Sequence, residues 1–365
     1  MKKRHRSFAL LIGTGLFVAG FVAVAAASAP RVSFIRTATS TPASALNTRV
    51  SAPPLDIAAY NKKLLELGAV ATSSPWYAAF LDDTVASTTS PRPRWPVKTV
   101  YPNAGAILPF NRVVAYYGNF YSKGMGALGQ YPTDVMLQKL ASASAQWAAA
   151  DPSTPVIPAI HYIVVTAQEA PQADGMYRLR MPDSQIDKAL ELAAQIHGLV
   201  FLDFQVGLST LQKELPQYEK YLAMQNVHLG IDPEFSMKTG AKPGTVIGSF
   251  DAADINYAAN YLAGLVRAND LTPKILVVHR FTQDMVTHYK QITPLPEVQI
   301  VMDMDGWGSQ AKKIGTYTNV VAAEPVQFTG FKIFYKNDTL PPSEGIFAPA
   351  QVLKLTPQPI YIQYQ

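Results

Sequence analysis

The stretch "VHLGIDPEF", Val227 to Phe235, is a short apolar run that ends on two carboxylates with a proline between them. A run of this length with nearly continuous aliphatic residues is typical of a strand that is covered on both faces. Asp232 and Glu234 stand two positions apart, so on an extended chain their side chains share one side. The stretch therefore predicts a buried strand with two acids at its carboxyl end.

Seven other runs in the chain follow the same pattern, in which an apolar stretch turns polar at its end. With the first, they span residues 112–120, 156–165, 199–207, 227–235, 274–281, 298–308, 330–338 and 359–365. Helical patterns separate them at residues 133–149, 184–197, 209–224, 252–268, 283–291, 309–318 and 349–355. Eight strands that alternate with helices over about 260 residues predict an α/β fold, the (β/α)8 TIM barrel. A doubly wound parallel sheet is the alternative, because the sequence does not show whether the sheet closes.

The chain before the barrel divides into three parts. Basic residues in the first six positions precede an apolar stretch at residues 8–27, so residues 1–29 are expected to be a signal peptide, or a membrane anchor if they are not cleaved. Residues 30–54 are rich in Ser, Thr, Pro and Ala and predict a disordered spacer. Residues 55–104 predict short helices at 57–67 and 76–81 and a proline-rich loop, and residues 105–365 form the barrel. We therefore expect an exported protein, extracellular or held at the cell surface.

The composition excludes several classes of protein. Hydrophobic residues make up 48% of the 365 residues and charged residues only 16%, which is typical of a globular chain. Four of the net +5 charges come from Lys2, Lys3, Arg4 and Arg6, and no lysine or arginine run follows, so we expect no nucleic-acid partner. There is no cysteine, and therefore neither a disulfide framework nor a lipid-modified cysteine.

Polar residues at the ends of the predicted strands form the candidate site, because active sites of such barrels lie at the carboxyl face. The carboxylates expected to be catalytic are Glu234, Asp232, Asp203 and Asp305. The residues expected to bind substrate are Tyr117, Asn119, His161, Gln205, His279, Asp303, Trp307, Tyr335 and Gln363. The alternative for each acid is to cap the helix that follows its strand.

Asp232 and Glu234 have a specific expected role. Two neighbouring carboxyl groups in a partly dry mouth do not both ionise easily, so one pKa should rise. We expect Glu234 to be the protonated general acid and Asp232 to set its proton affinity, with Asp203 or Asp305 as the partner carboxylate.

Three of these motifs resemble a known family. "VVAYYGNF" on the first strand, Asp-x-Glu at Asp232 and Glu234, and "MDMD" on the sixth strand resemble the chitinase-like barrels of glycoside hydrolase family 18. The resemblance implies that Glu234 is the proton donor, Asp232 its supporting acid and Asp305 the acid of the sixth strand. The chain departs from the family at Val227, Gly230 and Met304, and has no Ser-x-Gly-Gly on the third strand. With "DPE" at residues 232–234, "DGWG" at 305–308 and a terminal "YQ", the chain also resembles a group of uncharacterised secreted bacterial barrel proteins, a resemblance that implies no activity.

The chemistry of these residues fits the cleavage of sugars, which needs a proton donor and a second carboxylate. We therefore expect a glycoside hydrolase-like barrel that acts on a cell-wall or extracellular polysaccharide, with no cofactor and no metal. Two alternatives stay open. The first is a metal-dependent hydrolase with His161, His279, Asp203 and Asp303 as ligands. The second is a barrel that binds a wall polymer without cleaving it.

Overall fold

The computed structural model describes residues 52–81, 93–343 and 345–365, which belong to one compact unit, Ala52–Gln365. The predicted signal peptide or anchor, and the predicted spacer up to residue 51, lie outside the described residues. Within the part of the chain that is described, no helix is long and apolar enough to cross a membrane.

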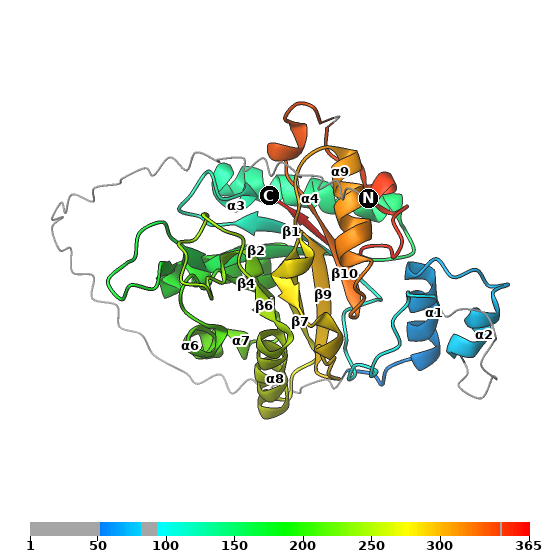
Figure 1. Ribbon diagram of the computed structural model, residues 1–365. Coiled ribbons are helices and arrows are strands. Elements are labelled where there is room, and N and C mark those ends of the chain that lie inside the picture. Colours follow the sequence, from blue (N-terminus) through cyan, green and yellow to red (C-terminus); the bar gives the residue numbers. More distant parts are fainter. Residues whose placement is uncertain (1–51, 82–92, 344) are drawn as a thin grey trace, which may run out of the picture. The chain divides into compact units, whose positions relative to one another are not determined.

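Eight parallel strands close into a barrel (Figure 1). They are β1 (Arg112–Gly118), β2 (Val156–Ala167), β4 (Leu199–Phe204), β5 (Val227–Ile231), β7 (Lys274–Arg280), β9 (Val298–Met304), β10 (Phe328–Ile333) and β11 (Tyr361–Tyr364). Each strand pairs with the next, and β11 pairs in parallel with β1, where Val113 lies opposite Tyr361. This closure confirms the TIM barrel and excludes the open, doubly wound sheet.

Alternation along the strands separates two apolar cores. On β1, Val113 and Ala115 point into the barrel and pack with Phe201 and Val301 of other strands. Val114 and Tyr116 belong to a second core outside the barrel, together with apolar residues of the helices. Because successive side chains point to opposite faces, a polar residue two positions after an interior apolar residue also points into the barrel.

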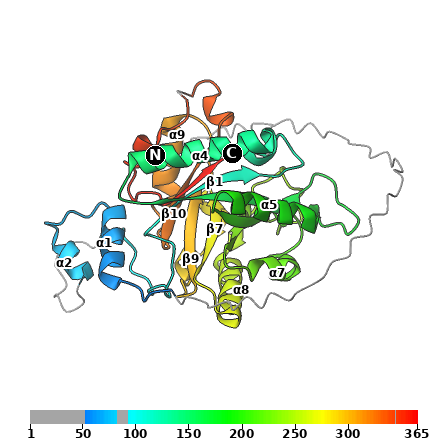
Figure 2. The same cartoon turned by 180° about the vertical axis from the view of Figure 1, so that it is seen from behind.

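Helices cover the outside of the barrel, as α4 and α8 show in two opposite views and α5 shows in the second (Figures 1 and 2). The helical elements are α3 (Ala127–Gln130), α4 (Thr133–Ala150), α5 (Asp183–Gln195), α6 (Leu211–Glu214), η1 (Leu215–Tyr218), α7 (Glu219–Leu222), α8 (Ala252–Asn269), α9 (Gln310–Thr316), η5 (Tyr317–Val321) and α10 (Pro349–Val352). Most follow the predicted alternation of strand and helix. The short antiparallel strand β3 (Arg178–Arg180), which pairs with the end of β2, was not expected from the sequence.

The helix predicted at residues 283–291 is wrong. This segment consists of η3 (Gln283–Met285), the short strand β8 (Val286–Thr287) and η4 (Tyr289–Gln291), and β8 pairs with β6 (Phe250–Asp251). The cause is the buried Arg280, whose guanidinium donates to the backbone carbonyls of Thr282, Gln283 and Val286. These bonds use carbonyls that a continuous helix would need for its own hydrogen bonds.

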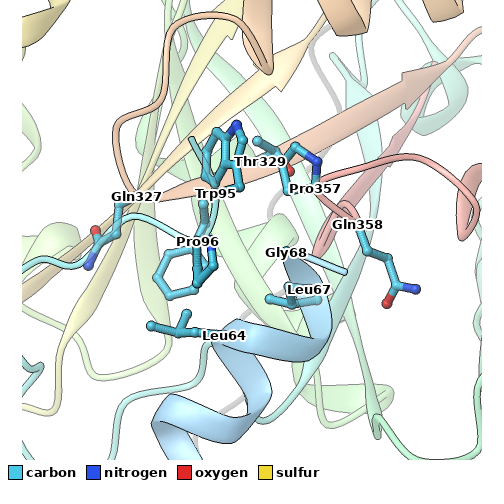
Figure 3. A pocket seen from close by; sticks show the side chains of 10 residues that line it. Leu64, Leu67, Gly68, Trp95, Pro96, Gln327, Thr329, Pro357 and Gln358 are labelled. Atoms are coloured by element: carbon cyan, nitrogen blue, oxygen red, sulfur yellow. The ribbon is translucent and has the colours of Figure 1, made fainter. Parts of the chain in front are cut away.

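The amino ends of the strands are closed by α1 (Ile57–Leu67), which precedes α2 (Pro75–Leu81). Tyr60 and Leu64 of α1 are buried in the interior apolar core. A small pocket at this end is lined by residues of α1, by Trp95 and Pro96, and by the segments that lead into β10 and β11 (Figure 3). Trp95 fixes the lining segment by donating its indole N–H to the carbonyl of Ala322 at 2.8 Å. This end of the interior is therefore filled by apolar side chains of α1 and the strands.

Candidate active site

Every barrel strand contributes a buried polar side chain to the carboxyl end of the interior. These side chains are Tyr117 of β1, His161 of β2, Asp203 of β4, Asp232 directly after β5, His279 of β7, Asp303 of β9, Lys332 of β10 and Gln363 of β11. None is more than 2% exposed. Alternation explains the set, since each lies two positions after an inward residue of its strand.

Asp203 is the centre of this cluster. Its Oδ2 accepts a hydrogen bond from the hydroxyl of Tyr117 at 2.8 Å, and its Oδ1 lies 3.3 Å from Nε2 of both His161 and His279. Burial alone would raise the pKa of Asp203, but the two imidazoles hold this pKa well below its ordinary value. Asp203 is therefore ionised even though it has no exposed surface.

The two histidines beside Asp203 differ in charge. Burial lowers the pKa of His161 to about 4, so this ring is neutral at neutral pH. Burial acts on His279 in the same direction, but Asp203 and Asp305 outweigh it and raise the pKa of His279 well above its ordinary value. His279 is therefore an imidazolium between two carboxylates, with Nδ1 at 3.3 Å from Oδ2 of Asp305.

Asp305 and Lys332 form a second ion pair at the mouth of the barrel, the open region at the carboxyl ends of the strands. The ammonium of Lys332 lies 2.8 Å from Oδ1 of Asp305 and 3.9 Å from the ring centroid of Tyr117. Burial opposes ionisation, but Lys332 and His279 lower the pKa of Asp305. Two anions, Asp203 and Asp305, are thus balanced by two cations.

Asp303 is the third acid of this region, and it differs from the other two. Burial raises its pKa to about 7, and both of its carboxyl oxygens lack a hydrogen-bond partner among the described residues. Its Oδ2 lies 3.6 Å from Nδ1 of His279. Asp303 can therefore hold a proton near neutral pH.

The acid pair after β5 does not lie on the strand, which corrects the prediction that Asp232 and Glu234 share one side of it. The strand ends at Ile231, and Glu234 lies in the 3-10 turn η2 (Pro233–Phe235). Asp232 caps this turn, because its Oδ1 accepts from the backbone N–H of Glu234 at 3.1 Å. The local cause is Pro233, which favours the first position of a helical turn.

Both members of the pair retain protons more strongly than ordinary acids. Burial, with the negative charges of Asp203 and Asp305, raises the pKa of Asp232 to about 7. Burial, Asp232 and Asp305 raise the pKa of Glu234 to about 8. Gln205 donates to the second oxygen of Asp232 at 3.3 Å. The capping alternative thus holds for Asp232 in addition to its place in the mouth, while Glu234 is the more basic carboxylate.

Two predicted binding residues lie elsewhere. The amide of Asn119 donates to the carbonyl of Ile163 and accepts from the N–H of Tyr121, so it fixes the loop after β1. The hydroxyl of Tyr335 lies 2.7 Å from that of Tyr116, in the core outside the barrel. Neither side chain is in the interior cluster.

Trp307 is 43% exposed, and the ammonium of Lys312 lies 5.0 Å from its ring centroid. It follows β9 and the acid Asp305 in the chain, at the carboxyl face of the barrel. This exposed position suits the predicted stacking on a ligand.

Sequence reasoning missed Lys332 and Tyr361. The predicted strand at residues 330–338 placed Asp338 at its end, whereas β10 is Phe328–Ile333 and Asp338 lies in η6 (Asn337–Thr339), paired with Lys313. The shift hid Lys332, although its spacing from Phe328 on the same strand matches the inward pattern. Tyr361 was not among the predicted site residues, but its hydroxyl lies 2.5 Å from Nδ1 of His161.

Gly230 explains how the cluster fits into the barrel. A Cβ at this position of β5 would overlap Nε2 of His161 and Oδ1 of Asp203. The absence of a side chain here provides the space that these two groups occupy. The departure from the acidic motif of the chitinase-like family at Gly230 is thus a steric requirement of this site.

Comparison with protein-family models finds no match for the chain, and no curated protein matches its sequence. In structure, the chain is distantly similar to a hyperthermophilic endo-beta-1,4-glucanase solved with substrate, at 7% identity and a TM-score of 0.35 over 70% of this chain and 89% of the other. A sugar phosphate isomerase/epimerase from Parabacteroides distasonis gives 10% identity and a TM-score of 0.32 over 73% and 90%. A dihydropteroate synthase from Burkholderia cenocepacia gives 9% and 0.31 over 70% and 86%. Scores of this size carry no argument about activity, and family 18 in particular gains no support.

Proposed function

We propose that this barrel is a hydrolase that cleaves a cell-wall or extracellular polysaccharide by carboxylate general acid/base chemistry. The observation that carries the proposal is the pair at the mouth, in which Glu234 keeps its proton to about pH 8 beside acids that are ionised. Glycosidic cleavage needs this combination of one protonated and one ionised carboxyl group.

In this proposal Glu234 is the proton donor. Its carboxyl proton passes to the glycosidic oxygen as the bond from that oxygen to the anomeric carbon breaks. Water supplies the hydroxyl group that the anomeric carbon gains, and its remaining proton restores Glu234. Asp232 keeps the Glu234 proton in place, because ionised Asp232 would disfavour a second negative charge beside it.

Asp305 is the better candidate for the partner carboxylate. It is 8% exposed, whereas Asp203 is fully buried and occupied by Tyr117 and two histidines. Lys332 and His279 keep Asp305 ionised, so that it can stabilise positive charge as it develops on the sugar ring. Trp307, half-exposed at the same face, offers an indole for a sugar ring to stack on.

The location of the protein belongs to this proposal as well. The basic and apolar residues at positions 1–29 support export, with anchoring through residues 8–27 if they are not removed. A polysaccharide outside the cell is then the accessible polymer. Nothing in the proposal needs a nucleic-acid partner.

The decisive experiment compares the wild-type chain with Glu234→Gln on chitin, peptidoglycan, α-glucans and β-glucans, with release of reducing sugar as the readout. Loss of a general acid lowers the rate by about 10²–10⁴-fold, so Glu234→Gln should lose most activity while remaining folded. Glu191→Gln, an exposed position on α5, is the matched control and should retain full activity.

Two results would contradict the proposal. The first is a Glu234→Gln protein as active as the control. The second is binding of an insoluble polymer by the wild-type chain with no sugar released from any of the four substrates, which would favour the non-catalytic binding barrel.

A further inference from the structure

Three polar atoms meet at the floor of the mouth without hydrogen bonds. Oδ1 of Asp203 lies 3.3 Å from Nε2 of His161 and 3.3 Å from Nε2 of His279. The three atoms lie within 4.8 Å of one another. All three residues are fully buried, and none of these atoms has a hydrogen-bond partner among the described residues. Buried polar atoms are nearly always satisfied, so this convergence indicates a shared ligand.

Two of the three separations in the cluster match those of ligands on one metal ion. Ligand atoms at about 2.1 Å from a tetrahedral ion are separated from each other by about 3.4 Å. Both distances from Oδ1 of Asp203 to the histidine nitrogens match that separation. The three residues come from β2, β4 and β7, so the ligands are held by strands of the closed barrel and not by loops.

The outer atoms of two of these residues are held as metal ligands usually are. The second oxygen of Asp203 accepts from the hydroxyl of Tyr117 at 2.8 Å. The other nitrogen of His279, Nδ1, lies 3.3 Å from a carboxylate oxygen of Asp305. A carboxylate behind a histidine orients the ring and strengthens it as a ligand.

The outer nitrogen of His161 faces a hydroxyl, which can accept its N–H, and an amide nitrogen, which can only donate. This Nδ1 lies 2.5 Å from the hydroxyl of Tyr361 and 3.1 Å from the side-chain amide of Gln363, which leaves Nε2 facing Asp203. Gly230 lies against these two inner atoms, and any side chain at that position would fill the space beside them.

We propose that His161, Asp203 and His279 bind a first-row divalent transition-metal ion such as Zn²⁺, which would take the place of the proton that Nε2 of His279 carries without the ion. Two imidazoles and one carboxylate favour such ions over Mg²⁺ and Ca²⁺, which prefer oxygen ligands. Three protein ligands leave a further position for water or a substrate atom, as in catalytic zinc sites. This binding site does not depend on the proposed cleavage of polysaccharide.

The test uses the full chain without added histidines, stripped with a chelator and then dialysed against Zn²⁺ or Mg²⁺. Elemental analysis should find about one Zn²⁺ per chain and no retained Mg²⁺. Zn²⁺ should also raise the melting temperature, because an ion that binds only the folded state stabilises it.

The key variant is His161→Phe, which removes the ligand atom and keeps an aromatic ring in stacking distance of Phe201, 5.1 Å between centroids. His228→Phe is the matched control, because His228 packs against the same Phe201, also at 5.1 Å, and lies outside the cluster. We expect His161→Phe to lose bound Zn²⁺ and its thermal shift, and His228→Phe to keep both. If His161→Phe does not fold, Asp203→Asn takes its place with the same expectation.

Tyr361→Phe tests the supporting contact, because it removes the hydroxyl that can accept a hydrogen bond from Nδ1 of His161. Loss of a partner behind a ligand weakens metal affinity by about 10–100-fold, so this variant should still bind Zn²⁺, but more weakly. A wild-type chain that retains no Zn²⁺, or a His161→Phe or Asp203→Asn chain that binds it as tightly as wild type, would overturn the metal site. Zn²⁺ binding with no sugar release would support the metal site and contradict the proposed function. Sugar release without Zn²⁺ binding would support the proposed function and contradict the metal site.

Discussion

At the scale of single residues, the mouth of the barrel separates acids that are ionised from acids that keep their protons. Asp203 and Asp305 form ion pairs with His279 and Lys332, whereas at Asp232 and Glu234 burial and the repulsion of other carboxylates outweigh the attraction of these two cations. The neighbours of each carboxyl group, and not its residue type, therefore determine whether the group is ionised or protonated.

This separation makes stability depend on pH in a definite direction. Glu234 has an ordinary pKa of 4.5 and a pKa of about 8 in the folded chain. Between these values the folded state binds more protons than the unfolded state, so this stabilising contribution is complete below about pH 4.5 and is lost as pH rises through about 8. We expect Glu234→Gln to melt at a higher temperature than wild type above pH 8, and the gap to shrink toward pH 4.5. Melting curves of both chelator-treated proteins across this range test it, and a constant gap would contradict it.

The acids could be named from the sequence, but their surroundings could not. The strand-end pattern identified Asp203, Asp232, Glu234 and the histidines as a group. Lys332 was missed because the predicted strand was shifted toward the next loop. Its ion pair with Asp305 joins the ends of two neighbouring strands, β10 and β9. Such contacts are fixed by barrel closure, which a linear pattern does not contain.

At the scale of elements, the hairpin of β2 and β3 is attached to α6 by one buried acid. Glu214 accepts from Arg178 at 2.8 Å, from Arg180 at 2.7 Å and from the hydroxyl of Ser209. From the sequence alone, Arg178 and Arg180 could be solvated arginines at the rim or could meet an anionic group. Their pairing with Glu214 gives them a structural role instead.

We therefore expect Glu214→Gln to lower the free energy of unfolding by about 3 kcal/mol, because a buried ion pair that loses one partner leaves charges uncompensated. Urea unfolding measures this. Arg267→Ala, which breaks an exposed pair with Glu297, is the control and should cost less than about 1 kcal/mol. Equal effects for the two variants would show that Glu214 is not a special attachment point.

Elements with a strong apolar period were predictable to within a few residues, as β1, α1 and α8 show. The segment at residues 283–291 was not, because its conformation depends on the side chain of Arg280 and on pairing with β6. The spacing of its apolar residues favours a helix, but these tertiary contacts determine its conformation.

At the scale of the whole molecule, the compact unit begins at Ala52 and includes α1 as a cover for the amino ends of the strands. A truncated chain that starts at Ala52 should fold with an unchanged melting temperature, because this unit contains both apolar cores. A chain that starts at residue 105 should be much less stable, since it loses Tyr60, Leu64 and Leu65 from the interior core. Circular dichroism with thermal melting checks both, and equal melting temperatures would contradict the role of α1.

The pairing of β1 with β11 also has a kinetic meaning. These strands join Val113 to Tyr361 across almost the whole barrel sequence, and contacts between such distant positions form late during folding. β11 contains Tyr361 and Gln363, whose side chains contact Nδ1 of His161. Transient separation of β11 from β1 would therefore remove the contacts that position His161. A ligand bound at His161 favours the closed state, so hydrogen exchange of the β11 amides should slow when an ion or substrate is bound.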